Sequence, residues 1–272
     1  MAVASAARDM SAFWSRIVVA LAALPVVLGL VWLGGWWVLV LGVVAGLLAL
    51  HEYFTMIREL RPLALGGFAG LVLALIGARL GGIVWMLGGF MSTFATAFLL
   101  HGVARTKSSA TAAIGSTVLG VAWIGLGLGH VLMLRDLGPN GRLAAMTVLI
   151  AVFASDTIAY FTGRLVGRHK LVPSISPGKT WEGFVAGVVA SVFVAFVALY
   201  KQHFLSIPAS IVLGFVVAFA GALGDLFESA LKRDMQVKDA GSLLAGHGGV
   251  LDRLDSVLFA AIASFYAILA LQ

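Results

Sequence analysis

The chain has 272 residues, of which 61% are hydrophobic and 11% are charged, and its mean hydropathy is +1.06. A soluble domain carries about 25% charged residues, so this composition excludes a soluble globular protein and indicates a polytopic membrane protein. The sequence contains no cysteine, which excludes disulfides and thiolate metal sites. Its formal charge of +6 comes from basic residues in short loops between apolar runs. We therefore expect anionic lipid and a phosphorylated substrate as partners, and no nucleic acid.

Apolar runs that are long enough to span a bilayer follow one another along the chain. A helix of about 20 apolar residues crosses the hydrocarbon core, and the sequence predicts an all-α bundle of about nine such helices. The first run is too long for a cleaved signal peptide and lacks an A-x-A-like site. The weakest boundary is ARLGG at 78–82, between the third and fourth spans. The predicted spans are 12–33, 34–57, 63–80, 82–102, 109–135, 142–163, 179–200, 206–231 and 249–271.

One continuous membrane domain is expected, with N-terminal helices at 1–108 and a region at 109–272 that carries the chemical motifs. Nine spans place the termini on opposite sides of the membrane. Cytoplasmic loops carry the excess of Lys and Arg, and 14 of the 18 basic residues fall on the N-terminal side. The N-terminus and the polar segments 164–178 and 232–248 are therefore predicted to be cytoplasmic, in an inner membrane, with the C-terminus outside. The four basic residues on the other side are Arg79, Arg135, Arg142 and Lys201.

Acidic side chains gather near the cytoplasmic ends of three predicted spans. Asp156 and Asp225 each lie within about 12 Å of their helix end at the α-helical rise. A carboxylate in a membrane helix is costly unless it is paired or faces water. A divalent cation would remove the repulsion among several carboxylates, and oxygen ligands favour Mg²⁺, Ca²⁺ or Mn²⁺ over Zn²⁺. The predicted metal ligands are Asp156, Asp225, Glu228, Asp252 and Asp255; the alternative is a set of buried ion pairs with Arg164, Lys232 and Arg253.

Two polar loops supply basic residues that complement these acids. Both loops precede a helix, and glycines before a helix N-terminus leave backbone N–H groups free for phosphate oxygens. Carboxylates that hold Mg²⁺ beside loops that hold phosphates favour phosphoryl or nucleotidyl transfer. The alternative is an ordinary basic loop that binds lipid head groups. The candidate residues are Arg164, Arg168, Lys170 and Lys179 in the first loop, and Lys232, Arg233, Lys238 and His247, with Gly246, Gly248 and Gly249, in the second.

Other suggestive patterns have simpler explanations. GKT at 178–180 is not a P-loop, because that motif requires glycine at the position of Pro173. GLGLGH at 125–130 is typical of close helix packing. Five isolated polar residues lack the spacing of metal ligands and are interpreted as interface or structural residues: His51, Glu52, His101, His130 and His203.

The segment SALKRDMQVKDAGSLLAGHGGVLDRLDS at 229–256 resembles the signature of the phosphatidate cytidylyltransferase family, also called CDP-diacylglycerol synthases. That signature reads S-x-x-K-R, four residues, K-D, then H-G-G-x-x-D-R-x-D, and every fixed position is met. The segments 155–168, 176–183 and 224–229 also resemble the family. Two positions depart from its usual pattern: Ala240 stands where serine is usual, and Ala245 where proline is usual.

The resemblance implies that phosphatidate attacks the α-phosphorus of CTP in a reaction that requires Mg²⁺ and releases pyrophosphate. It also implies a homodimer. Asp225, Asp252 and Asp255 would hold the metal, with Asp156 and Glu228 as further ligands. The residues expected to contact CTP are Lys232, Arg233, Lys238, His247, Gly248 and Gly249, with Asp239 orienting Lys238 or binding the nucleotide. The residues expected at the phosphatidate head group or the leaving pyrophosphate are Arg164, Ser176 and Lys179.

Two other classes of protein remain open from the residues alone. A cation-coupled transporter also carries carboxylates inside the membrane, but its sites lie near the midplane with broken helices, whereas these acids lie toward one end. A different CTP-dependent lipid enzyme, such as a polyprenol kinase-like protein or an archaeal-lipid cytidylyltransferase, would differ only in its lipid substrate.

Overall fold

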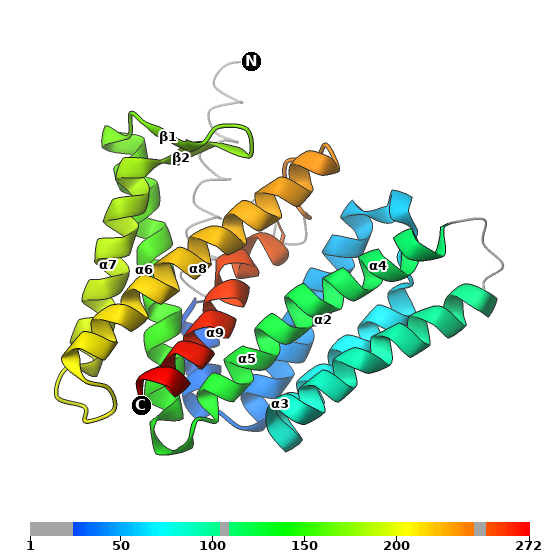
Figure 1. Ribbon diagram of the computed structural model, residues 1–272, viewed down its shortest axis with the longest axis horizontal. Helices are drawn as coiled ribbons and strands as arrows, with labels where there is room; N and C mark the ends of the chain where they lie inside the picture. Colours follow the sequence, from blue (N-terminus) through cyan, green and yellow to red (C-terminus); the bar gives the residue numbers. More distant parts are fainter. Residues whose placement is uncertain (1–23, 104–108, 242–248) are drawn as a thin grey trace, which may run out of the picture.

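The structure is a computed structural model that describes residues 24–103, 109–241 and 249–272, and it is a helical bundle with one small sheet (Figure 1). A short helix at Leu24–Leu33 precedes α2. The longer helices are α2 (Trp36–Met56), α3 (Ala64–Val103), α4 (Ala110–Gly120), α5 (Leu126–Arg135), α6 (Gly141–Val166), α7 (Trp181–Leu199), α8 (Ile207–Asp234) and α9 (Leu251–Leu271). Strands β1 (Lys170–Val172) and β2 (Ser176–Thr180) pair antiparallel between α6 and α7.

Helix α3 folds back on itself at Gly81 and Gly82, where the backbone leaves helical geometry and Gly82 has a φ of 63°. Glycine adopts such a positive φ without steric cost. The two arms pack antiparallel on small residues: a Cβ at Gly66 would lie 3.3 Å from the Ala97 amide nitrogen, and one at Gly70 would collide with Thr93. The weak boundary expected at 78–82 is therefore a turn between two helical arms.

Among the described residues, seven helices are long and apolar enough to cross a membrane. That number treats α3 as a single helix, and only 24–33 of the predicted first span is described. The prediction of a helical protein with several helices apolar and long enough to span a membrane is confirmed, whereas the number of nine spans stays a prediction. The β1–β2 hairpin was not expected, because its segment reads as a polar loop.

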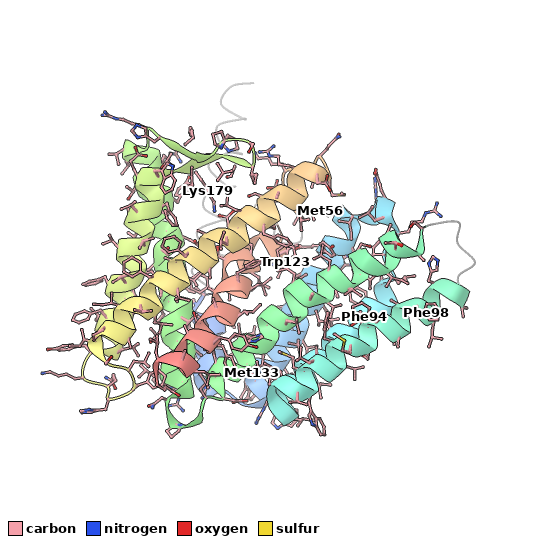
Figure 2. All side chains as sticks on the ribbon, viewed as in Figure 1. Met56, Phe94, Phe98, Trp123, Met133 and Lys179 are labelled. Carbon is pink, nitrogen blue, oxygen red and sulfur yellow. The ribbon has the colours of Figure 1, made fainter. Side chains whose placement is uncertain are left out.

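The chain from α4 through a π-helical turn at Val121–Gly125 into α5 lies at the centre of the bundle. Glycines let its neighbours approach: a Cβ at Gly127 would lie 2.8 Å from Leu258 of α9. The Trp123 ring meets Phe227 of α8 edge-on at 4.9 Å between centroids, and Figure 2 labels Trp123 among the central side chains. Close approach through small residues is the usual way that membrane helices associate, as expected for 125–130.

The polar segments meet at one end of the bundle. The hairpin, the end of α8, the start of α9 and the end of α2 lie together there, whereas the α7–α8 connection and the C-terminus lie at the opposite end (Figure 1). Helices α6 and α7 pack closely beneath the hairpin, where a Cβ at Gly183 would lie 2.6 Å from the Ala159 carbonyl oxygen. Thr180 caps α7 by accepting a hydrogen bond from the Gly183 amide at 3.2 Å.

Candidate active site

A cavity of about 540 Å³ opens between α6, β2, α7 and α8 beneath the hairpin. Its wall includes two of the predicted metal ligands, Asp156 and Asp225, and two of the predicted phosphate contacts, Arg164 and Lys179. Figure 2 shows Lys179 at the hairpin end of the bundle. Further polar residues of the lining are Ser155, Tyr160, Lys170, Ser176 and Thr180. The structure therefore brings acids of α6 and α8 and cations of the first predicted loop to one cavity.

Lys179 and Asp225 form an ion pair across this cavity, with 2.7 Å between Nζ and Oδ2. Asp225 also accepts a hydrogen bond from the Ser229 hydroxyl at 3.3 Å, one turn further along α8. Both charged side chains are partly exposed to the cavity. The pair thus keeps one acid and one cation beside space that a ligand can enter.

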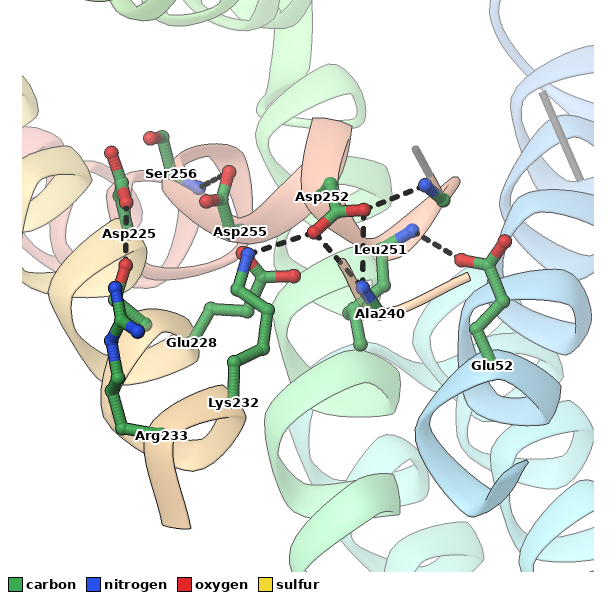
Figure 3. Close-up of polar contacts among 12 residues, drawn as sticks. Glu52, Asp225, Glu228, Lys232, Arg233, Ala240, Leu251, Asp252, Asp255 and Ser256 are labelled. Carbon is green, nitrogen blue, oxygen red and sulfur yellow. Dashed lines mark hydrogen bonds and ion pairs between the residues drawn. The ribbon is translucent and has the colours of Figure 1, made fainter. Parts of the chain in front are cut away.

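A second ion-paired group lies toward α9, and Figure 3 shows it. The Lys232 Nζ lies 2.8 Å from Glu228 Oε2 and 2.8 Å from Asp252 Oδ1. Glu228 is only 1% exposed, and a buried carboxylate is strongly destabilising without a partner. Lys232 therefore neutralises two carboxylates, one from its own helix and one from α9.

Asp252 also accepts hydrogen bonds from the backbone that precedes it. The Gly249 amide donates to Oδ2 at 2.6 Å, and the Ala240 amide donates to both carboxylate oxygens at 3.3 Å. A carboxylate in the first turn of a helix satisfies unpaired N–H groups and interacts favourably with the helix dipole. At Ala240, where the family usually has serine, the contact with Asp252 is made by the backbone.

Asp255 lies one turn further along α9 and is 8% exposed. Its Oδ1 accepts the Ser256 amide at 2.7 Å. Gly224 lets α8 approach this point, because a Cβ there would collide with the Asp255 carbonyl oxygen. The acids of α8 and α9 are consequently neighbours, and Figure 3 shows Asp225 and Asp255 on facing helices.

The chemistry of these side chains suits a hard cation, since all the candidate donors are carboxylate oxygens. In the part of the chain that the structure describes, no group of three or more histidine, aspartate or glutamate side chains is arranged to hold a metal ion. Two lysines instead neutralise Asp225, Glu228 and Asp252. The alternative of buried ion pairs therefore holds for Lys232, which pairs with Glu228 and Asp252. The predicted set of metal ligands stays a prediction.

The remaining predicted phosphate contacts are spread around the same end of the bundle. Arg233 donates from Nε to the Ile175 carbonyl oxygen at 3.3 Å and so ties α8 to the hairpin. Arg164 donates to the Tyr160 hydroxyl at 2.9 Å. Lys238 and Asp239 are exposed. The predicted contacts His247 and Gly248, and the departure at Ala245, lie outside the described residues.

An apolar groove of about 670 Å³ runs between α7 and α8 beside the polar cavity. Phe184 and Phe219 border it at one end and Phe196 and Ile211 further along, and Phe184 lines the polar cavity as well. Cavity and groove therefore adjoin, one polar and charged, the other apolar along its length.

Glu52 of α2 is the residue of this region whose partner the sequence did not indicate. It was interpreted as an interface or structural residue, and its Oε2 accepts the Leu251 amide at 2.8 Å at the start of α9 (Figure 3). The available signal was its position: it is the single carboxylate within the apolar run Trp36–Met56, and such residues need a specific partner.

The chain matches the model of the cytidylyltransferase family over residues 14–271. A phosphatidate cytidylyltransferase from Staphylococcus haemolyticus (strain JCSC1435) is 34% identical over 249 residues, which cover 90% of this chain and 94% of that protein. One from Mycobacterium bovis is 36% identical over 254 residues, covering 84% and 79%. One from Bacillus subtilis (strain 168) is 36% identical over 183 residues, covering 66% and 68%.

The family match and these relatives identify a nucleotidyltransferase, and its helices are long and apolar enough to span a membrane. The chain belongs to the cytidylyltransferase family, and the resemblance seen in its signature segment is confirmed. The match includes the whole region from α6 to α8 that builds the cavity, and α9 as well.

Proposed function

We propose that the protein transfers a cytidylyl group from CTP to phosphatidate, which gives CDP-diacylglycerol and pyrophosphate. The observation that carries this proposal is the pairing of the charged cavity with the apolar groove through Phe184. A lipid phosphate needs cations for its head group and apolar surface for its chains. The relatives described above are named phosphatidate cytidylyltransferases, and the proposed activity is the one in their name.

In this reaction an oxygen of the phosphatidate phosphate attacks the α-phosphorus of CTP, and the bond to the pyrophosphate oxygen breaks. Phosphatidate is already an anion, so no strong base is required. Catalysis is positioning and charge neutralisation. We assign Lys179, Arg164 and Ser176 to the lipid phosphate or the leaving pyrophosphate, because they line the cavity. The residues assigned to the CTP phosphates are Lys232, Arg233, Lys238, His247, Gly248 and Gly249, with Asp239 beside them.

Mg²⁺ is the cofactor in this proposal, and the carboxylates of α6, α8 and α9 would hold it: Asp225, Asp252 and Asp255, with Asp156 and Glu228 adjacent. When bound, it would neutralise charge on the CTP phosphates. Lys179 and Lys232 neutralise three of these acids in the structure. In the complex, we propose that both ammonium groups turn toward phosphate oxygens.

The hairpin end of the bundle is assigned to the cytoplasmic side of the inner membrane. Among the described residues, ten Lys and Arg lie in segments at that end, and Arg79, Arg135, Arg142 and Lys201 lie in segments at the other (Figure 1). This asymmetry follows the positive-inside rule. With nine spans the C-terminus is outside. A homodimer is part of the proposal, and light scattering of the purified protein measures it.

The test of this function is product analysis of the purified protein in detergent. With CTP, phosphatidate and Mg²⁺, CDP-diacylglycerol should accumulate in the organic phase, with an equal amount of pyrophosphate in the aqueous phase. Replacing phosphatidate with a polyprenol, or CTP with ATP, should give no product. Product from the polyprenol instead would assign the protein to another class of lipid enzyme.

A further inference from the structure

Glu52 is a buried carboxylate on α2, in the N-terminal half of the chain, and no described residue of that half lines the cavity. It lies one turn before the end of α2 and is 2% exposed. A carboxylate so deeply buried must receive hydrogen bonds, because it is otherwise strongly destabilising. Its Oε2 receives the Leu251 amide at 2.8 Å, across 199 residues of sequence. This contact joins α2 to the first turn of α9.

Two glycines make room for the Glu52 carboxylate. A Cβ at Gly241 would lie 2.5 Å from Oε1, and a Cβ at Gly249 would collide with Oε2. These glycines flank the segment 242–248, and Gly249 leads directly into α9. Glu52 therefore lies against the backbone at Gly241 and at Gly249, as well as at the start of α9.

The same backbone segments hold Asp252. Gly249 donates its amide to Asp252 Oδ2 at 2.6 Å, and Ala240, the neighbour of Gly241, donates to both oxygens of Asp252 at 3.3 Å. Figure 3 shows Glu52 and Asp252 on the two sides of this backbone. A shift of Gly249 or Leu251 would thus move the groups that orient Asp252.

We propose that Glu52 is a positioning residue that fixes the backbone at Gly241 and Gly249 and the start of α9 so that Asp252 has the orientation the reaction needs. This inference rests on the proposed function for its kinetic consequence. Its structural part, the restraint of 249–252 by Glu52, stands separately. A positioning role predicts loss of kcat with an unchanged KM for phosphatidate, because the lipid phosphate is assigned to Arg164, Ser176 and Lys179, which Glu52 does not orient.

The experiment compares Glu52→Ala, Glu52→Gln and Glu52→Asp with the matched control Tyr53→Phe. Tyr53 is the buried neighbour on α2 and donates to the Ser116 carbonyl oxygen at 3.2 Å, away from α9. Glu52→Gln keeps an acceptor for the Leu251 amide, whereas the shorter Asp side chain does not reach it. We expect kcat to fall at least about tenfold in the Glu52→Ala and Glu52→Asp variants. It should fall less than about threefold in the Glu52→Gln and Tyr53→Phe variants.

Hydrogen exchange of the 249–255 amides is the readout that does not depend on activity. Exchange should rise at least about tenfold in Glu52→Ala and stay close to wild type in Tyr53→Phe. If Glu52→Ala does not fold, the comparison of Glu52→Gln with Glu52→Asp decides the question. Glu52→Gln should then have the higher kcat and the slower hydrogen exchange at 249–255. Equal kcat and equal exchange in the Glu52 variants and the control would overturn the proposal. If wild type transfers no cytidylyl group, the proposed function fails, while the exchange data still decide whether Glu52 restrains α9.

Discussion

Lys232 on α8 donates to Asp252 on α9, with 2.8 Å between Nζ and Oδ1. The contact joins the helix that carries Asp225 and Glu228 to the helix that carries Asp252 and Asp255. Lys232 also meets Glu228 at 2.8 Å, so a single ammonium group balances carboxylates from both helices. In the proposed reaction these acids and this cation act on the same nucleotide.

Removing the charge of Asp252 should abolish most of the activity with little loss of folded protein. Asp252→Asn keeps the size of the side chain, but it weakens the contact with Lys232 and removes a proposed metal ligand. We expect kcat to fall at least about a hundredfold, which corresponds to about 2.7 kcal/mol of barrier. Asp225→Asn should behave alike. Steady-state rates with saturating CTP and phosphatidate measure the effect.

The matched control is Asp136→Asn at the opposite end of the bundle. Asp136 also pairs with a cation, Arg79, at 3.3 Å between Oδ2 and Nη1. Its substitution should leave kcat within about twofold of wild type. If Asp252→Asn retained more than about a tenth of wild-type activity, Asp252 would not be a metal ligand.

Lys179 should matter for the lipid substrate, because it lines the cavity beside the apolar groove. Lys179→Met removes a cation and leaves Asp225 without its ion pair. We expect kcat/KM for phosphatidate to fall at least about tenfold, and Lys179→Arg to recover part of it. Lys201 is exposed at the end of the bundle opposite the hairpin, and Lys201→Met should leave kcat/KM for phosphatidate unchanged. Equal rates in the two methionine variants would remove Lys179 from the site.

Filling the apolar groove should discriminate between lipids by chain length. Val189 on α7 lines the groove and is 63% exposed, so Val189→Trp fills it without disturbing the core. We expect KM to rise at least about threefold for phosphatidate with long acyl chains and to stay unchanged for a short-chain analogue. Val197→Trp is the control, since Val197 is equally apolar but lies outside the groove. An equal rise for both chain lengths would show that the groove binds no acyl chain.

The membrane class and the signature residues were predictable because they depend on local pattern. Long apolar runs predict helices whatever their neighbours, and the turn at Gly81–Gly82 was foreseen from ARLGG. The gathering of charged residues at one end followed from topology. Asp156, Lys179 and Asp225 were expected at the same end of the bundle, and all three line one cavity.

Contacts between distant segments were not predictable from the same patterns. Nothing in the sequence around Glu52 indicates that it meets Leu251, because that contact depends on how α2 packs against α9. The pairing of Lys179 with Asp225 and of Lys232 with Asp252 also depends on helix packing. The β1–β2 hairpin was missed since its polar, proline-containing sequence lacks the alternation of a typical strand.

The orientation can be tested with single cysteines, because the natural sequence has none. Ser109 precedes α4 at the hairpin end of the bundle, and Gln202 lies in the α7–α8 connection at the opposite end (Figure 1). In sealed cells, a membrane-impermeant thiol reagent should label Gln202→Cys and spare Ser109→Cys. In inside-out vesicles the pattern should reverse. Labelling of Ser109→Cys in intact cells would overturn the assignment of the hairpin end to the cytoplasm.

The central claim is that the α-phosphoryl group of CTP passes to phosphatidate, and the most direct measurement follows that atom. Purified protein is given CTP labelled at the α-phosphate or, in parallel, at the γ-phosphate, and the chloroform-soluble product is counted. We predict α-label in the lipid only when phosphatidate and Mg²⁺ are both present, and γ-label only in the aqueous pyrophosphate. Transfer of γ-label into lipid would identify a kinase. If neither label moved into lipid while a cation gradient drove uptake, the protein would be a transporter. Either result contradicts the account.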